Sequence, residues 1–247
     1  MKDFERIVCK DIPELSAQAA AEFVRQANER SATAGRFVVA LSGGSTPRAL
    51  YSLLAGAEFQ SQVPWDRVHF FWGDERCVPP DHPDSNYRMA FETLLSKAPV
   101  PEENIHRIEA ELAPEAAAAG YERTIRDFFR LSGADWPRFD LIFLGLGDDG
   151  HTASLFPGSE ALNERHRLVV AAYNEKLKSH RVTLTLPVLN RAANIFFLVA
   201  GEGKAAVLRD VFSGSTGSRD LPAQQIAPKN GRLVWFLDEA AASSLQS

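Results

Sequence analysis

The stretch DLIFLGLGDDGHTASLFPGS, residues 140–159, decides how the rest of this chain is interpreted. It begins with strand-forming residues, and Gly145, Gly147 and Gly150 then follow at short intervals. Glycine adopts backbone conformations that other residues resist, so we expect a buried strand that ends in a sharp turn. In an open α/β sheet, ligands bind beyond the carboxyl ends of the strands, which makes His151 a candidate reacting group. A glycine turn with an ordinary surface histidine is the alternative.

The same order of strand, loop and helix recurs on both sides of this stretch. Apolar strands that alternate with helices predict a mainly parallel sheet covered on both faces, which is a three-layer α/β/α sandwich. No repeat, linker or break in composition divides the chain, so residues 1–247 are predicted to form a single domain. The predicted strands are 4–10, 37–41, 68–72, 105–108, 140–147, 168–172, 181–186, 195–200 and 233–237, and the main predicted helices follow Pro13, Pro47, Ser85, Pro114 and Lys204.

Composition and charge exclude several classes of function. The chain has 247 residues, of which 45% are hydrophobic, and a formal net charge of -5. An acidic chain is a poor partner for nucleic acid or for an anionic membrane surface, although local cations can still hold a small anion. Cys9 and Cys77 lack metal-binding spacing, the N-terminus lacks a signal-peptide core, and no apolar run is long enough to span a bilayer. We therefore expect a cytoplasmic protein without nucleic-acid or membrane partners.

The loop SGGSTP, residues 42–47, is a candidate phosphate site. It lies between a predicted strand and a predicted helix, so the amides of Gly43, Gly44, Ser45 and Thr46 can point at an anion beside the positive helix end. The loop has neither the GxxxxGK pattern of a Walker A motif nor the GxGxxG pattern of a dinucleotide site. A tight turn without a ligand is the alternative.

Three further cations and one carboxylate stand at predicted strand ends. Asp74 and Arg76 belong to a GDER loop that follows a strand, Arg181 opens a strand, and Lys204 follows a glycine turn. Guanidinium groups bind phosphate or carboxylate through a planar fork, but solvated surface charges are the simpler interpretation of each residue alone. The six histidines show no metal-binding spacing and no GxSxG nucleophile motif is present, so we predict neither a metal site nor a serine hydrolase.

Taken together, LSGGSTPRALY, FFWGDERCVPPDHPDSNYRMA, FLGLGDDGHTASLFPGS, RVTLTLPVLNRA and GEGKA resemble the 6-phosphogluconolactonase family. The motifs run from residue 41 to residue 206, and GDER with DGHTASLFP is the most specific combination. The resemblance implies a Rossmann-like fold, no cofactor, and hydrolysis of 6-phospho-D-glucono-1,5-lactone to 6-phosphogluconate in the oxidative pentose phosphate pathway. A monomer or a small homo-oligomer is expected.

Lactone hydrolysis requires a base for water, an acid for the departing ring oxygen and donors for the developing negative charge. His151 is the candidate acid/base, and Asp149 matches the family's DGH aspartate, which either holds a loop amide or orients the histidine. By the same resemblance, Arg181 and Lys204 join the SGGST amides as ligands of the 6-phosphate. Arg76 serves either the phosphate or the oxyanion, and Asp74 binds sugar hydroxyls or positions Arg76.

Two other functions are alternatives to a lactonase. The related glucosamine-6-phosphate deaminases resemble GHIAFNEP at the histidine turn, with a glutamate five residues after the histidine. Phe156 occupies that position here and cannot transfer a proton, which favours the lactonase. The other alternative is a sugar-phosphate-binding protein that has lost its chemistry, but both the histidine and the DER residues are intact.

Overall fold

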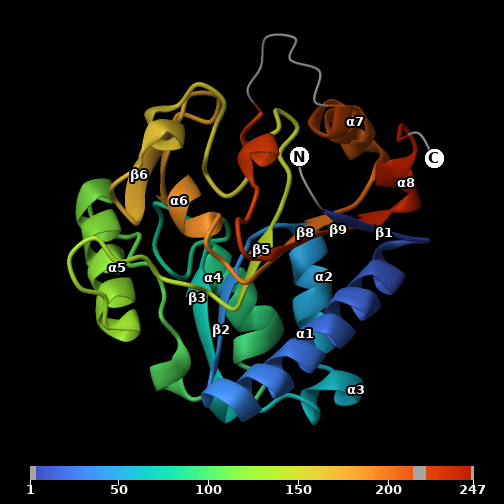
Figure 1. Ribbon diagram of the computed structural model, residues 1–247, viewed down its shortest axis with the longest axis horizontal. Helices are drawn as coiled ribbons and strands as arrows, with labels where there is room; N and C mark the ends of the chain where they lie inside the picture. Colours follow the sequence, from blue (N-terminus) through green and yellow to red (C-terminus); the bar gives the residue numbers. More distant parts are fainter. Residues whose placement is uncertain (1–3, 214–220, 246–247) are drawn as a thin grey trace.

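The protein is built on a six-stranded parallel sheet with strand order β1-β9-β8-β5-β2-β3 (Figure 1). The computed structural model describes residues 4–213 and 221–245. All five neighbouring pairs of this sheet are parallel, as predicted from the alternation of strands with helices. The strands are β1 (Glu5–Cys9), β2 (Phe37–Leu41), β3 (Val68–Trp72), β5 (Leu141–Leu144), β8 (Asn194–Val199) and β9 (Arg232–Asp238).

Helices cover both faces of the sheet, which confirms the predicted three-layer arrangement. Figure 1 shows α1 (Ile12–Ala34) on one side of β1, β8 and β9, and α7 (Ala205–Ser213) with α8 (Glu239–Ala242) on the other. No helix in residues 4–213 or 221–245 has both the length and the apolarity to cross a membrane. The remaining helices are α2 (Ser45–Leu54), α3 (Ala57–Gln60), α4 (Asn86–Ala90), α5 (Pro114–Phe129) and α6 (Leu186–Leu189).

Local sequence signals define the ends of the helices. The Asp11 side chain accepts a hydrogen bond from the amide of Glu14 and caps α1, which ends at Gly35 with φ 76°. Ser85 caps α4 in the same way, by accepting from the amide of Arg88. Both helix starts therefore leave fewer unsatisfied amides, and the predicted positions of Pro13, Gly35 and Ser85 are confirmed.

A second sheet, which is antiparallel and has strand order β4-β7-β6, carries several residues of the candidate site. It consists of β4 (Asp74–Arg76), β6 (Val169–Asn174) and β7 (Ser179–Leu184). Gly73 joins the two sheets, because its amide donates to the Leu41 carbonyl at 2.9 Å while its own carbonyl accepts from Leu184 at 2.8 Å. The chain therefore leaves the parallel sheet at Gly73 and places GDER against β7.

Two local predictions were wrong. GDER was predicted as a loop, but residues 74–76 form β4, because their backbone pairs with residues 181–183, which are distant in sequence. Residues 105–108 were predicted as a strand, but Ile105 makes only an isolated bridge to Phe70. In both cases local propensity does not decide the structure. A segment becomes a strand only where the fold gives it a neighbouring strand to pair with, as it does for residues 74–76 but not for residues 105–108.

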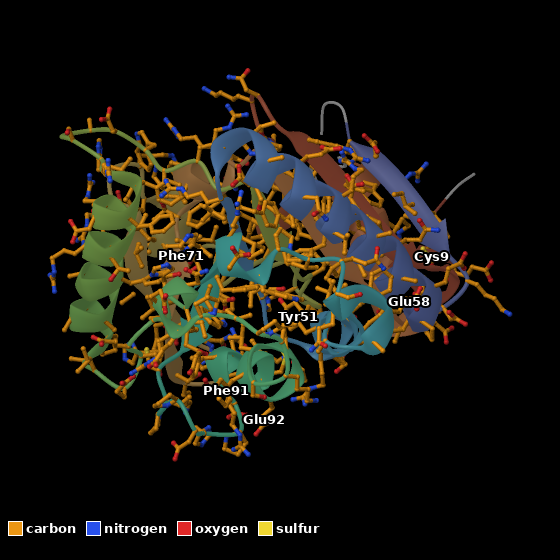
Figure 2. The ribbon with its side chains drawn as sticks, turned by 90° about the horizontal axis from the view of Figure 1, so that it is seen from below. Cys9, Tyr51, Glu58, Phe71, Phe91 and Glu92 are labelled. Carbon is orange, nitrogen blue, oxygen red and sulfur yellow. The ribbon has the colours of Figure 1, made fainter. Side chains whose placement is uncertain are left out.

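The core is rich in aromatic side chains. Trp72, Trp235 and Tyr51 are among its largest fully buried members. Figure 2 shows Tyr51 within the molecule, whereas Phe91 lies at its lower rim. The Tyr51 hydroxyl accepts from the Ser42 amide and donates to the Ser42 carbonyl, both at 3.0 Å, and so fixes the chain where β2 ends and the SGGSTP loop begins.

A pair of histidines is packed among aromatic rings between β3 and α5. Nε2 of His106 lies 3.3 Å from Nδ1 of His69, and the His106 ring stacks on Phe71 with a centroid distance of 4.3 Å. Burial, with a smaller contribution from His69, lowers the pKa of His106 from its ordinary value of 6.5 to about 4. The folded protein therefore keeps His106 neutral under conditions in which the unfolded chain binds a proton.

We expect the free energy of unfolding to fall by about 1–2 kcal/mol as the pH is lowered from 6.5 to 4, because only the unfolded state gains a proton at His106 in this window. Partial exposure of the ring keeps the effect below that of the full pKa shift. Urea unfolding at pH 7 and pH 4.5 measures it. The variant His106→Phe should lose part of the pH dependence, whereas His166→Phe, at an exposed position, should retain it. Equal pH dependence in the two variants would contradict this account.

Candidate active site

A cavity of about 350 Å³ lies beyond the carboxyl ends of β2 and β5, where the second sheet meets the first. This is the edge of a parallel sheet at which ligands bind. The cavity brings together residues of the second sheet and of the segments that follow β2, β5 and β8 of the first sheet. Its lining includes Ser42, Gly43, Gly44, Asp74, Arg76, Asn86, Gly147, Asp148, His151, Ser154, Phe156, Asn174, Arg181 and Lys204.

His151 is held by the glycine turn and by Asp149. Nδ1 of His151 lies 2.5 Å from Oδ1 of Asp149, and the same oxygen accepts from the His151 amide at 3.1 Å. Gly147 lies directly against the imidazole, and a Cβ at this position would overlap Nδ1 and Cε1. The Gly147 amide also donates to the His151 carbonyl at 2.9 Å, which closes the turn. The glycines therefore let the imidazole pack against the backbone.

The pairing with Asp149 determines the chemistry that His151 can perform. Burial acts to raise the pKa of Asp149, but the hydrogen bond and charge of His151 outweigh it and the net pKa is lowered. An ionised carboxylate only accepts hydrogen bonds, so Nδ1 carries the proton and Nε2 is left as the basic nitrogen. The arrangement can therefore accept a proton and return it.

Arg76 and Arg181 stand directly opposite each other in the antiparallel pair β4–β7. Like charges at such positions are destabilising. Burial, followed by the charge of Arg76, lowers the pKa of Arg181. The backbone carbonyls of Asp84 and His180 accept from Arg76 and Arg181 respectively, at 2.7 and 3.0 Å, but a carbonyl does not neutralise a charge. Nε of Arg76 is buried without a partner among the described residues. The pair is therefore suited to an anion.

The SGGSTP loop and one more cation also line the cavity. Gly43 and Gly44 are lining residues, and Gly44 is the N-cap of α2 without a side-chain cap. Lys204 lies 2.5 Å from Oδ1 of Asp148, whose pKa is lowered mainly by this hydrogen bond. Gly43 lets Asn86 approach closely, because a Cβ on Gly43 would overlap the Asn86 side chain.

Four polar residues of the site were not singled out from the sequence. Ser154 donates to Oδ2 of Asp74 at 2.7 Å, and Asn86 donates to the Asp74 carbonyl at 2.9 Å. Glu75 is buried and accepts from the amides of Arg76, Asn86 and Tyr87, each within 2.8 Å. The Ser42 hydroxyl lines the cavity and is buried without a partner among the described residues. Of these four residues, only Asn86 lay beside a signal in the sequence, namely the predicted helix cap at Ser85.

The predicted site residues do not all reach the cavity. Gly43, Gly44, Asp74, Arg76, His151, Arg181 and Lys204 line it. Ser45 and Thr46 instead lie in the first turn of α2, outside the lining. Asp149 lines an adjoining groove and contributes through His151. Both contacts expected for Asp149 are present, since its Oδ1 accepts from the His151 amide and lies 2.5 Å from Nδ1 of the imidazole. Asp74 contacts Ser154, and among the described residues no hydrogen bond joins its carboxylate to Arg76.

Fold and cavity together define a Rossmann-like α/β protein with one histidine and three cations around a small-molecule pocket. The sequence matches the family described as glucosamine-6-phosphate isomerases/6-phosphogluconolactonase over residues 10–235. The chain belongs to this family.

Individual relatives agree with this assignment. A protein of Nostoc sp. named 6-phosphogluconolactonase is 44% identical over 85% of both chains. The structure of a 6-phosphogluconolactonase from Trypanosoma cruzi superposes with a TM-score of 0.87 at 33% identity and covers 99% of this chain and 98% of its own. A monomeric glucosamine-6-phosphate deaminase, 20% identical, shares the fold with a TM-score of 0.81 over 98% of this chain and 100% of its own.

Proposed function

We propose that this protein hydrolyses 6-phospho-D-glucono-1,5-lactone to 6-phospho-D-gluconate. The observation that carries the proposal is the pairing of His151 with Asp149 beside a cavity that also holds the facing guanidinium groups of Arg76 and Arg181, which make no ion pair with another described residue. A base and an anion site that line one cavity match a substrate that has a reactive carbonyl at one end and a phosphate at the other. The names of the 44% identical relatives support the same substrate. We expect the protein to act in the cytoplasm as a monomer or small homo-oligomer.

In the proposed reaction, Nε2 of His151 removes a proton from water as the water oxygen attacks C1 of the lactone. The carbonyl oxygen becomes negatively charged and is stabilised by a nearby donor, for which Arg76 is the candidate. The tetrahedral species then collapses, the bond from C1 to the ring oxygen breaks, and imidazolium returns its proton to that oxygen. Asp149 keeps Nε2 basic at the start and stabilises imidazolium in between.

The phosphate is proposed to lie between Arg181, Lys204 and the backbone of Gly43 and Gly44, which line the cavity before α2. Charge-assisted hydrogen bonds from these groups would anchor the substrate and bring C1 to His151. The anchoring uses the cations of the chain itself, and water is activated by imidazole, so the proposed reaction requires no metal ion. Activity should therefore persist in EDTA.

The deaminase alternative is disfavoured by the residue that contacts His151. The Phe156 ring packs against the imidazole with a centroid distance of 4.9 Å. A phenyl ring neither donates nor accepts the protons needed to open an amino-sugar ring. Phe156 also lines the cavity, so no acid or base occupies the position at which the deaminases carry a glutamate.

A coupled assay with two substrates tests the proposal. Freshly prepared 6-phosphogluconolactone is supplied and 6-phosphogluconate is followed, while a parallel reaction contains glucosamine 6-phosphate and is monitored for ammonia. We expect lactone hydrolysis well above the spontaneous rate and no ammonia. Ammonia release without accelerated lactone hydrolysis would overturn the proposal in favour of the deaminase, and the absence of both activities would favour a binding protein.

The variant Gly147→Ala should lower kcat by ~10- to 100-fold, because the new Cβ displaces the imidazole from its position. Gly120→Ala, in α5 and outside the cavity lining, is the matched control, since a Cβ there meets Nη2 of Arg123 at 3.8 Å, which is an ordinary contact. Steady-state kinetics of both variants, with thermal unfolding to confirm that they fold, measures the effect. Equal activity of the two variants would show that the close approach of Gly147 does not position His151.

A further inference from the structure

A second cavity, of about 570 Å³, lies at the opposite edge of the sheet from the candidate active site. Figure 1 shows α1 leading into β2 at the bottom of the view, and the cavity is formed where β2 and β5 begin. Val38 and Asp140 line it from the sheet. Its remaining lining includes four arginines, Arg30, Arg36, Arg130 and Arg138. The two cavities have no lining residue in common.

The arginines are only partly neutralised. Arg30 is paired with Asp140, with Nε 2.7 Å from Oδ1. Within residues 4–213 and 221–245, no carboxylate lies within 4 Å of the side chains of Arg36, Arg130 or Arg138. The C-termini of α1 and α5 end beside this cavity, and each is equivalent to about half a negative charge. Four guanidinium charges set against one carboxylate and two helix ends leave about two positive charges without a counterion.

Three of the four side chains are already held in place. Asp140 fixes Arg30 at 2.7 Å, and Arg138 donates through Nη2 to the Asn230 carbonyl at 2.7 Å. The guanidinium of Arg36 lies 4.4 Å from the centre of the Phe128 ring. Donors that are fixed before binding lose little conformational entropy when a ligand arrives. The chain as a whole is acidic, with a net charge of -5, so the four arginines form a local positive cluster rather than part of a generally basic surface.

We propose that this cavity, here called the arginine cavity, binds the phosphate group of a phosphate monoester. A phosphate monoester carries about two negative charges at neutral pH, which matches the uncompensated charge. Guanidinium groups bind its oxygens through parallel N–H donors. The volume exceeds that of a phosphate alone, and Phe129 and Ala34 supply apolar surface for an organic part. The inference is independent of the proposed lactonase activity.

Calorimetric titration of AMP at low salt tests the proposal, with adenosine as the ligand that lacks the phosphate. Because AMP can also enter the candidate active site, binding is measured in Arg181→Gln, which weakens that site. We expect AMP to bind to Arg181→Gln and adenosine not to bind. Adding Arg36→Gln and Arg130→Gln should weaken the remaining AMP binding by at least ~10-fold, since two charge-assisted contacts are lost. The affinity should also fall as salt is raised.

A control separates the arginine cavity from net charge. Arg123→Gln with Arg209→Gln, also made in the Arg181→Gln background, removes two exposed charges elsewhere and should leave AMP binding unchanged. The double variant Arg36→Gln, Arg130→Gln on the otherwise natural chain should keep kcat and KM for the lactone, and circular dichroism confirms that it folds. Absence of AMP binding in Arg181→Gln, equal binding of adenosine, or an equal loss in the control would each overturn the proposal.

Discussion

Replacing His151 by glutamine should lower kcat for lactone hydrolysis by ~10²- to 10⁴-fold, the usual contribution of a positioned acid/base group. Glutamine preserves the size and polarity of the side chain but cannot take a proton from water. Because glutamine keeps a polar side chain at this position, we expect the unfolding temperature to change far less than kcat. The rate is measured as the excess over spontaneous hydrolysis.

The control for His151 is His166→Gln, which changes an exposed histidine outside the cavity. It should retain full activity. Asp149→Asn provides a second comparison, because an amide no longer requires the proton on Nδ1 and the basic nitrogen is no longer fixed. A His151→Gln variant with kcat within a few-fold of the natural enzyme would show that His151 is not the acid/base of the reaction.

Replacing Arg181 by glutamine should raise KM by ~10- to 100-fold while changing kcat much less, because a charge-assisted contact to the phosphate is lost before and during reaction alike. We expect the same substitution to raise the free energy of unfolding. Arg181 stands opposite Arg76, so removing one of the two like charges relieves repulsion in the folded protein. Steady-state kinetics and urea unfolding of the same variant measure both effects.

Arg181→Lys separates charge from geometry, since lysine keeps the charge but not the planar fork. We expect its KM to lie between those of the natural enzyme and Arg181→Gln. An Arg181→Gln variant that is destabilised and binds lactone normally would identify Arg181 as a structural residue. That outcome would exclude Arg181 from the phosphate site and leave the proposed roles of His151 and Asp149 intact.

Much of the fold could be predicted because its signals are local. Buried parallel strands are continuous apolar runs, such as residues 37–41, and helices carry their capping residues with them, as Asp11 and Ser85 do. The second sheet could not be predicted in this way. Residues 74–76 form a strand only because they pair with β7, whose residues lie more than a hundred positions further along the chain.

Some residues of the candidate site also had local sequence signals, and others did not. Glycine loops after parallel strands marked Gly43 and His151, because parallel strands carry their carboxyl ends to one edge. Arg181 was marked as a charge at the start of a predicted strand, and the antiparallel pairing of β4 with β7 brings it to the cavity. The roles of Ser154 and Asn86 carried no comparable signal, since each contacts Asp74 from a distant part of the chain.

The sequence by itself determined the alternation of strands and helices, the positions of the glycine turns and the residue types available for chemistry. These follow from backbone conformation and side-chain chemistry within a few neighbouring residues. Only the tertiary structure decided that Arg76 faces Arg181 and that four arginines gather around the arginine cavity. The physical reason is that charge balance depends on distances between groups, and those distances are set by how the sheets and helices pack.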